Sequence, residues 1–242
     1  MIEFIRKTYK QSKDALIKEL ECALLEEKKI HVVTANPEIM MHGDRNADYA
    51  RLLLNERTLI TPDGIGIVKA ANFLKCPVLE RIPGVEMVQE LLKILDQHQL
   101  SLYCYGSKAE VLEKFHHVLK ENYPDIKVVG LKDGYTNKED DVFKDIASKN
   151  PDLILVALGV PRQELVIRQH FDTFSKGIFV GVGGSLDVLS GSIKRAPQIF
   201  IKLNLEWLYR IAGDPKRIKR FYNNNVKFFK KLKTEKRIKN EN

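Results

Sequence analysis

The 242-residue sequence has only three cysteines, Cys22, Cys76 and Cys104, and none of them belongs to a Cys-x-x-Cys pair. Such spacing excludes a disulfide framework and gives no sign of a zinc site, so we interpret the thiols as core side chains. No apolar run approaches the ~20 residues that a membrane span requires. The first residues mix charged and apolar side chains and lack the apolar region of a secretory signal. We therefore expect a protein that stays in the cytoplasm and does not cross a membrane.

Several catalytic signatures are also missing. The sequence contains no G-x-G-x-x-G, no G-x-x-x-x-G-K, no G-x-S-x-G and no H-E-x-x-H segment. A dinucleotide-binding oxidoreductase needs glycines after its first strand, where this chain has Thr34-Ala-Asn36-Pro37. Asp63 nevertheless stands where the ribose-binding carboxylate of such an enzyme would lie, so this class is kept as a disfavoured alternative. The histidines are scattered, which does not favour a metal cluster.

The excess of positive charge is confined to one end of the chain. From Asp214 onward there are 11 Lys or Arg and 3 Asp or Glu, whereas the first 213 residues are neutral, with 29 of each sign. The whole net charge of +8 therefore belongs to the tail. A localised basic segment indicates a polyanionic partner, which can be anionic lipid, nucleic acid or a phosphorylated ligand.

Between residues 30 and 190, short apolar runs rich in β-branched residues alternate with segments of helical periodicity. The expected strands are 30–34, 58–61, 102–105, 126–131, 153–158 and 178–182, and the expected helices include 12–29, 47–54, 85–95, 111–119 and 142–148. This order predicts an α/β fold, a Rossmann-like and mainly parallel sheet with helices on both faces. We divide the chain into a Rossmann-like domain, 1–195, and a basic helical C-terminal appendage, 196–242.

The segment from Gly177 to Pro197 combines a strand, a glycine turn and a helix start. Gly183 and Gly184 follow the strand at once, so free N–H groups of the next helix would point at whatever lies above it, and an anion suits that position. Asp187 in the same turn could reach a sugar hydroxyl. The alternative, that these glycines serve only packing, is equally compatible with the residues.

Polar residues gather where the expected strands end, which is where open parallel sheets bind ligands. Each also has a local explanation: Asn36 as a helix cap, Asp63 in a Pro-Asp-Gly turn, and Gln163 with Glu164 at the start of a solvated helix. Their common placement is the stronger argument. The residues concerned are Thr34, Asn36, Asp63, Gly106, Ser107, Gly159, Gln163, Gly183 and Asp187.

Seven motifs in one order resemble the WecG/TagA/CpsF family of bacterial glycosyltransferases, over roughly residues 30–220. They are Thr34-Ala-Asn36, Pro62-Asp63-Gly64-Ile-Gly66, Arg81-x-Pro-Gly84, Gly159-x-Pro161-x-Gln163-Glu164, Gly181-Val-Gly183-Gly184, Arg195-Ala-Pro197 and Leu205-Glu206-Trp207-Leu-Tyr209-Arg210 with Pro215 and Arg217. Within the family, the chain is most similar to the N-acetylmannosaminyltransferases of wall teichoic acid synthesis.

This resemblance implies transfer of N-acetylmannosamine from its UDP donor to position 4 of N-acetylglucosamine on undecaprenyl diphosphate, with inversion. No short motif fixes the donor sugar, and N-acetylmannosaminuronic acid or glucose-type donors stay open. The resemblance supports Asp63 as the general base, a role for which a carboxylate at a strand end is suited. Since no Asp-x-Asp motif follows a strand, we expect no metal cofactor. Thr34, Asn36, Arg81 and Gln163 are expected to position the sugars, and Gly183 and Gly184 the donor phosphate or uridine.

The resemblance further implies that Arg210, Arg217 and Arg220 of the appendage close over the site and contact the diphosphate. One stripe of the tail is apolar, and a basic amphipathic helix of this kind lies on anionic membrane surfaces. The stripe comprises Ile218, Phe221, Tyr222, Asn225, Phe229 and Leu232. A helix packed on the body with a charged outer face is the alternative. We expect a peripheral enzyme on the inner face of the cell membrane. No nucleic-acid partner is expected, although a tail that binds nucleic acid is a further alternative. The sequence leaves open whether the protein forms a homo-oligomer.

Overall fold

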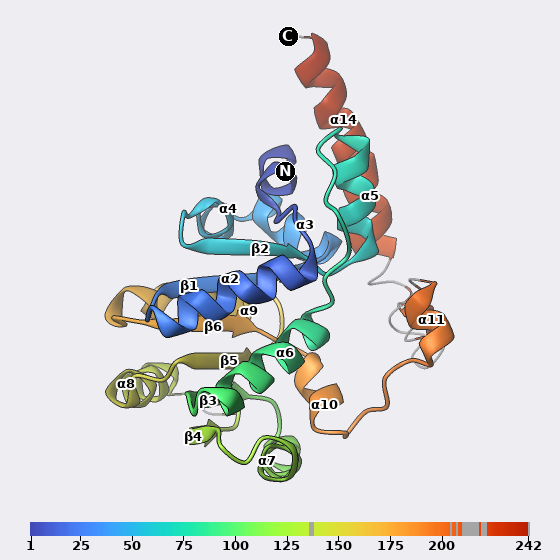
Figure 1. Ribbon diagram of the computed structural model, residues 1–242. Coiled ribbons are helices and arrows are strands. Elements are labelled where there is room, and N and C mark those ends of the chain that lie inside the picture. Colours follow the sequence, from blue (N-terminus) through green and yellow to red (C-terminus); the bar gives the residue numbers. More distant parts are fainter. Residues whose placement is uncertain (136–137, 204, 207, 210–217, 219–221, 242) are drawn as a thin grey trace.

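The computed structural model describes residues 1–135, 138–203, 205–206, 208–209, 218 and 222–241 (Figure 1). Over these residues the chain forms one six-stranded sheet in the order β2-β1-β6-β5-β3-β4, and every neighbouring pair is parallel. The strands are β1 (Lys29–Ala35), β2 (Thr58–Pro62), β3 (Ser101–Gly106), β4 (Lys127–Lys132), β5 (Leu153–Ala157) and β6 (Gly177–Gly181). The predicted parallel sheet and all six predicted strands are therefore confirmed.

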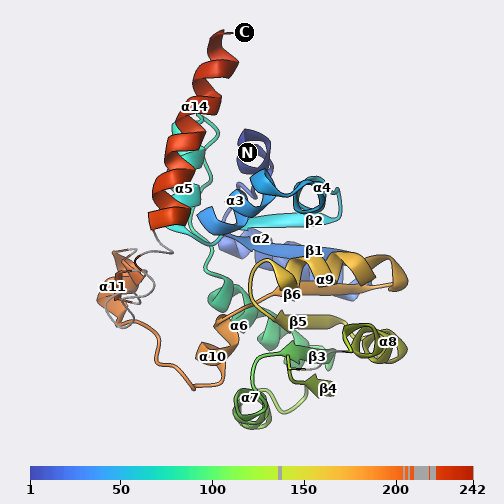
Figure 2. The same ribbon diagram turned by 180° about the vertical axis from the view of Figure 1, so that it is seen from behind.

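Helices cover both faces of the sheet because successive strand residues point to opposite sides. Val32 of β1 packs in one core cluster with helices α2, α6, α7 and α10, whereas its neighbour Val33 packs in another with α3 and α4. Helices α8 and α9 cover the second face at the other end of the sheet (Figure 2). Their bounds are α2 (Lys13–Leu25), α3 (Pro37–Arg45), α4 (Ala47–Leu54), α6 (Gly84–Gln97), α7 (Ala109–Asn122), α8 (Glu139–Lys149), α9 (Arg162–His170) and α10 (Ser185–Leu189).

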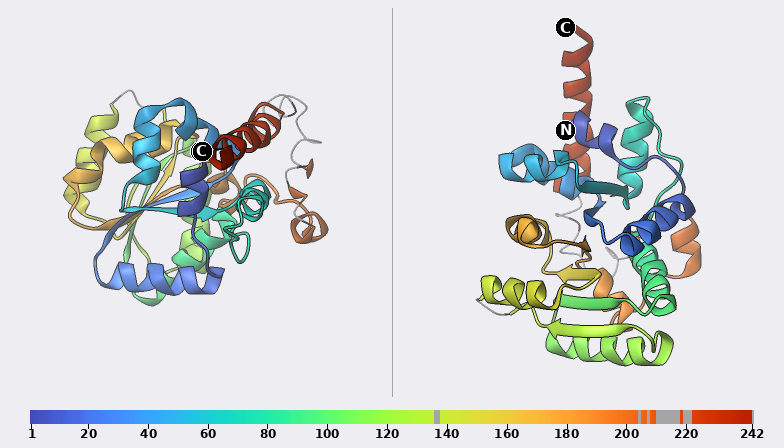
Figure 3. Two further views of the ribbon diagram at one scale, coloured as in Figure 1. Left: turned by 90° about the horizontal axis from the view of Figure 1, so that it is seen from above. Right: turned by 60° about the vertical axis from the view of Figure 1, so that its left-hand side comes forward.

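The C-terminal helix α14 (Lys227–Glu241) packs beside helix α5 (Ile65–Phe73), and the N-terminal helix α1 (Ile2–Lys7) also contacts it (Figures 1 and 3). Phe228 and Leu232 are fully buried in the cluster formed with α1, α3 and α5. On its polar side, Lys231 pairs with Asp44 of α3. Of the two alternatives for the tail, the structure shows for residues 227–241 the helix packed on the body. Leu232, which the sequence analysis placed on the apolar stripe facing the membrane, faces the core instead.

In the part of the chain that the structure describes, the other short elements are the 3₁₀ turn η1 (Phe171–Thr173), helix α11 (Gln198–Lys202) and the π-turn η2 (Tyr222–Val226). Helix α11 lies apart from the sheet, below the near end of α14 in Figure 1. Within the described part of the chain, no helix combines the length and apolar content needed to cross a membrane. The boundary between 1–195 and 196–242 stays a prediction.

Candidate active site

A crevice in the sheet is expected where two neighbouring strands send the chain to opposite faces. Strands β1 and β6 do this: β1 continues into α3 on one face, and β6 into α10 on the other. At this point the hydroxyl of Thr34 donates to the carbonyl of Gly181 at 3.3 Å. The ends of β1 and β6 are therefore joined at the switch point of the sheet.

Asp63 stands at the end of β2, beside β1. It is half-buried, and its Oδ1 accepts a hydrogen bond of 3.0 Å from the backbone N–H of Gly84 at the start of α6. The loop before α6 is tied to the same strand end, because the N–H of Ile82 donates to the carbonyl of Pro62 at 2.9 Å. The first N–H groups of a helix stabilise negative charge, so this arrangement suits a carboxylate. Asp63 also has a further partner and is not a free side chain.

Gly84 is the residue at which α6 approaches β1. A Cβ built on Gly84 would lie 2.9 Å from Cγ2 of Thr34, which is closer than real Cβ atoms come to other atoms. Only glycine therefore lets the helix start reach Asp63 while Thr34 keeps its place. Thr34, Asp63 and Gly84, which come from three different segments, are held together by this contact and the hydrogen bond.

Asn36 has the capping role that its local sequence suggested. Its Oδ1 accepts from the N–H groups of Glu38 at 2.9 Å and Ile39 at 3.1 Å, which fixes the first turn of α3. The N–H of Gly64 donates to the carbonyl of Ala35 at 3.0 Å, so Asn36 and Asp63 stand at adjacent strand ends. The C-terminal segment returns to this place: Oδ1 of Asn225 in η2 lies 3.6 Å from the position of a Cβ on Gly66.

Gln163 joins two glycine turns from inside the protein. It is 2% exposed, and its Oε1 accepts from the N–H of Gly159 at 3.1 Å and from that of Gly183 at 3.0 Å. Gly183 has φ of +46°, a conformation that favours glycine. The alternative that Gln163 and Glu164 simply open a solvated helix is excluded, because both side chains are buried.

Glu164 lies beneath the same turn. Gln163 Nε2 donates to its Oε1 at 2.7 Å, and a Cβ on Gly181 would lie 2.9 Å from that oxygen. Burial raises the pKa of Glu164 to about 7, although the hydrogen bond from Gln163 acts in the opposite direction. Near neutral pH this buried carboxyl therefore exchanges between its neutral and charged forms.

Arg81 is held by an acidic residue of the C-terminal segment. Its Nη2 lies 3.4 Å from Oε2 of Glu206, and both side chains are largely buried. Glu206 also faces Arg195, and Arg195 in turn bonds Glu86 of α6 at 2.7 Å. Sequence analysis assigned no role to Glu86 or Glu206, because no local pattern reveals a pairing across 109 or 125 positions of the chain.

Asp187 stands in the first turn of α10, half-buried, beside Gly184. Its backbone carbonyl accepts from Ser190 Oγ at 3.1 Å and from the N–H of Ile193 at 2.9 Å, which leaves the carboxylate outside these bonds. The structure therefore brings most of the predicted site residues to one edge of the sheet. Arg210, Arg217 and Arg220 lie outside the described residues.

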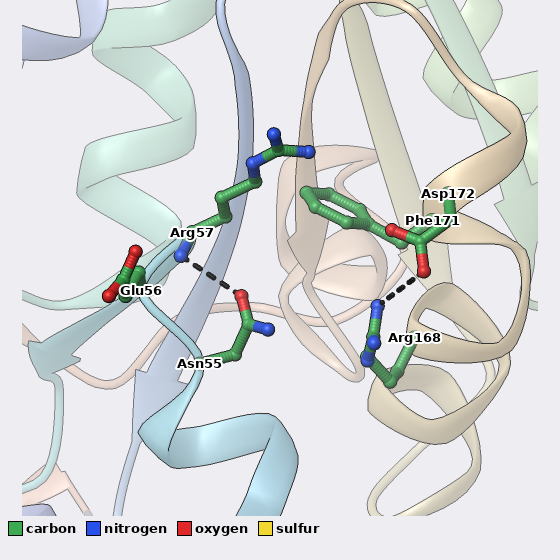
Figure 4. A pocket seen from close by; sticks show the side chains of 6 residues that line it. All are labelled: Asn55, Glu56, Arg57, Arg168, Phe171 and Asp172. Carbon is green, nitrogen blue, oxygen red and sulfur yellow. Dashed lines mark hydrogen bonds and ion pairs between the residues drawn. The ribbon is translucent and has the colours of Figure 1, made fainter.

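A different pocket, of about 240 Å³, lies at the opposite edge, where β2 begins and α9 ends (Figure 4). It is lined by Asn55, Glu56, Arg57, Arg168, Phe171 and Asp172. None of the predicted site residues is among them, and Arg168 pairs with Asp172 at 3.2 Å.

Among described residues, no group of three or more His, Cys, Asp or Glu side chains is placed to hold a metal ion. The absence of a metal cofactor stays a prediction.

Comparison with known proteins gives a family match and several similar enzymes. Residues 4–242 match the glycosyl transferase WecG/TagA/CpsF family. The chain is 40% identical over 211 residues to the N-acetylglucosaminyldiphosphoundecaprenol N-acetyl-beta-D-mannosaminyltransferase of Staphylococcus aureus (strain MW2), covering 87% of this chain and 82% of that relative. It is 37% identical over 207 residues to the enzyme of the same name from Bacillus spizizenii, covering 85% and 80%.

Proposed function

The chain is a member of the WecG/TagA/CpsF family of glycosyl transferases, and from this premise we propose that it transfers N-acetylmannosamine from UDP-N-acetylmannosamine to the 4-hydroxyl of N-acetylglucosamine on undecaprenyl diphosphate. The names of both relatives specify this sugar and this acceptor. This reaction is an early step in the synthesis of wall teichoic acid or of a related cell-surface polysaccharide. Another UDP-sugar donor is the alternative within the same family.

The observation that carries the proposal is the position of Asp63. Its carboxylate lies beside the switch point of the sheet, held by the N–H of Gly84. In the reaction, the acceptor hydroxyl attacks the anomeric carbon of the donor sugar and loses its proton to Asp63, while the bond from that carbon to the UDP oxygen breaks. A general base contributes about 10²- to 10⁴-fold to such a rate. Attack opposite to the leaving group inverts the configuration of the anomeric carbon.

The departing UDP needs positive charge or N–H donors near its phosphates. Gln163 Oε1 already accepts the N–H of Gly183, so we propose the N–H of Gly184 as the donor that this turn offers to the phosphates. Arg81 lies in the loop before α6, next to Ile82, which bonds the end of β2, and Arg210, Arg217 and Arg220 would add charge from the appendage. With these groups in place we propose a reaction that needs no metal ion.

The lipid acceptor requires the enzyme to meet a membrane. Exposed apolar side chains gather in the C-terminal segment before α14, and among them Ile199 and Leu203, on and just after α11, are 64% and 61% exposed. The others are Ile193, Leu208, Tyr209, Ile218 and Tyr222. Together with neighbouring lysines, they form the surface that we propose contacts the anionic inner face of the membrane.

The proposal is tested with purified protein, a short-chain lipid diphosphate N-acetylglucosamine acceptor and a panel of UDP sugars, with and without EDTA. We expect transfer from UDP-N-acetylmannosamine, insensitivity to EDTA and loss of transfer in Asp63→Asn. Asp172→Asn, at the opposite edge of the sheet, is the matched control and should keep full activity. If Asp63→Asn still transfers the sugar, Asp63 is not the general base. If EDTA abolishes transfer, the reaction needs a metal ion.

A further inference from the structure

Gln163 and Glu164 form a buried polar pair under the glycine turn that follows β6. They lie in the first turn of α9, a helix that packs against α4, β5 and β6. Their side chains are 2% and 1% exposed. With so little exposure, Glu164 can act on a ligand only through its neighbours.

The amide of Gln163 has one orientation that satisfies its surroundings. Its Oε1 accepts from the N–H groups of Gly159 and Gly183. If the amide were turned over, its NH₂ group would face these two donors and none of them would have an acceptor. The Nε2 must therefore face Glu164, whose Oε1 accepts from it at 2.7 Å. This acceptor on Glu164 fixes which side of the amide meets the two glycine turns.

The backbone of the turn lies directly on the pair. A Cβ on Gly181 would lie 2.7 Å from Nε2 of Gln163 and 2.9 Å from Oε1 of Glu164, so only glycine fits above them. Two residues later, the N–H of Gly183 is held by Gln163 at 3.0 Å. The next N–H, that of Gly184, is the one proposed to meet the donor phosphates. A shift of Gln163 would thus be passed to the phosphate-binding N–H.

The second oxygen of Glu164 faces Tyr49 of α4. Among the residues that the structure describes, Glu164 Oε2 and the Tyr49 hydroxyl are buried and neither makes a hydrogen bond of normal geometry. Burial is the largest influence on the pKa of both groups, but each also affects the pKa of the other, so the two lie close together. A hydroxyl both donates and accepts. Tyr49 can therefore accept the proton of a neutral Glu164 or donate to a charged one, and Oε1 accepts from Gln163 in both states.

The charge of Glu164 changes near neutral pH. Burial raises its pKa to about 7, hydrogen bonds from Gln163, the backbone and Tyr49 act to lower it, and the charge of Glu38 on α3 acts to raise it. No cation of the described residues is among these influences. Ionisation of Glu164 therefore adds a negative charge beneath the turn, and this charge repels a phosphate bound above it.

We propose that Glu164 is a positioning residue for the sugar donor, which acts through Gln163 on the glycine turn, and that the donor binds best while Glu164 is neutral. This inference rests on the proposed function, since it takes the diphosphate of a UDP sugar as the ligand of Gly184. The neutral carboxyl orients Gln163 without opposing the phosphate. The charged carboxyl orients Gln163 equally well but repels the phosphate. Donor affinity thus falls as pH rises through about 7.

Donor binding at different pH values tests the effect of the charge. The probe is UDP-N-acetylmannosamine, because a diphosphate esterified at both ends keeps its charge near neutral pH. Its Kd for the wild type should rise about three- to tenfold between about pH 6 and pH 8, as expected for charges separated by the turn. Glu164→Gln cannot ionise and should keep the low-pH affinity throughout. Uridine, which has no phosphate, should bind both proteins equally at each pH. Titration calorimetry measures both ligands.

Glu164→Leu tests the positioning role. Leucine has a similar size but offers no acceptor to Gln163 Nε2, so the KM for the donor should rise about tenfold or more, as expected for an unpaired buried donor. The KM for the lipid acceptor should not change. Glu164→Gln presents an amide oxygen to Gln163 and should restore the donor KM. A variant that merely folds poorly would lower the amount of active enzyme and leave both KM values unchanged.

Asp152→Asn is the matched control for both measurements. Asp152 is a buried carboxylate at the opposite edge of the sheet, where it pairs with Lys176 at 2.8 Å. Its substitution can cost stability, but the donor KM and the pH dependence of donor binding should equal those of the wild type. Equal effects of Asp152→Asn and Glu164→Leu on the donor KM would overturn the positioning role.

A third measurement needs no ligand. In protein labelled with ¹⁵N-glycine, the N–H signals of Gly159 and Gly183 should shift with a midpoint near pH 7 in the wild type and stay constant in Glu164→Gln. The N–H of Gly130 in β4, at the far edge of the sheet, should shift in neither. If the Gly183 signal does not titrate, or if the wild type and Glu164→Gln bind the donor with the same pH dependence, the inference is overturned and the proposed function stands. A wild type that binds no UDP sugar at any pH would overturn the proposed function, and this inference with it.

Discussion

The N–H of Gly84 donates to Oδ1 of Asp63 across 3.0 Å, which ties the start of α6 to the end of β2. The two residues are 21 positions apart, and the contact exists only because glycine lets α6 approach Thr34. The hydrogen bond orients the carboxylate. The geometry of the proposed base thus depends on a glycine that takes no part in the chemistry.

Asp63→Asn should abolish the base with little change in structure. The amide oxygen of asparagine can still accept from the Gly84 N–H, so folding and UDP binding should stay at wild-type levels. The rate of sugar transfer should fall by about 10²- to 10⁴-fold. Steady-state kinetics combined with UDP titration check this: a loss confined to kcat supports the base, whereas equal loss of UDP affinity would indicate a binding role instead.

Gly84→Ala should lower kcat by pushing α6 away from Asp63. The added Cβ would lie 2.9 Å from Cγ2 of Thr34, so either the helix start or Thr34 must shift. Thr34→Ser removes that methyl group and keeps the hydroxyl that bonds Gly181. We therefore expect the double variant, Gly84→Ala with Thr34→Ser, to recover much of the activity lost in Gly84→Ala. A double variant no better than the single one would show that the contact with Thr34 is not the cause.

The sheet could be predicted from the sequence because each strand has a local signal, a short β-branched run that ends in turn residues. Asp63, Thr34 and Asn36 followed from the general rule that ligands bind at the carboxyl ends of parallel strands. Helix α1 was not predicted, and its packing against α14 depends on residues at the two ends of the chain. Contacts of this kind leave no periodic pattern in the sequence.

The tail shows why one pattern can have two outcomes. An apolar stripe on a basic helix fits a membrane surface and a protein core equally well, since both bury the same face. The described structure places Phe228 and Leu232 in a core that α1, α3 and α5 complete. The contact between Glu206 and Arg81 could not be predicted from the sequence either, because the two residues are 125 positions apart and only the fold brings them together.

Leu232→Ala should destabilise the protein if α14 is part of the core. The side chain is fully buried, and Leu→Ala changes at such sites cost about 2–5 kcal/mol. Lys233→Ala, on the exposed side of the same helix, should change the free energy of unfolding by less than about 0.5 kcal/mol. Urea denaturation measures both. Equal, small effects of the two substitutions would mean that α14 does not contribute to the folded core in solution.

Glu164 should make the stability of the wild type fall as pH rises. Burial raises its folded-state pKa from the usual 4.5 to about 7, so folding favours the neutral carboxyl. That contribution is complete below the unfolded pKa and is lost as pH rises through about 7. Glu164→Gln cannot ionise, so relative to it the wild type should lose on the order of 2 kcal/mol between about pH 5 and pH 8. Glu113→Gln, on the exposed side of α7, should follow the wild type. A constant difference between wild type and Glu164→Gln across this range would contradict the raised pKa.

Membrane binding should depend on α11 and not on the outer face of α14. Ile199 and Leu203 are among the most exposed large apolar side chains in the described structure, whereas the apolar residues Phe228 and Leu232 of α14 are already buried. The double variant Ile199→Ser with Leu203→Ser removes apolar surface without opening the core. Its binding to anionic vesicles should fall by about tenfold or more, because each apolar side chain transferred out of water contributes ~1.5 kcal/mol or more. Leu25→Ser, on α2 and 51% exposed, is the matched control and should bind as the wild type does. Vesicle sedimentation measures this binding, and binding to an oligonucleotide is measured at the same salt concentration for comparison. Full vesicle binding by the double serine variant would exclude this surface, and tighter binding to the oligonucleotide than to vesicles would favour a nucleic-acid partner for the basic tail.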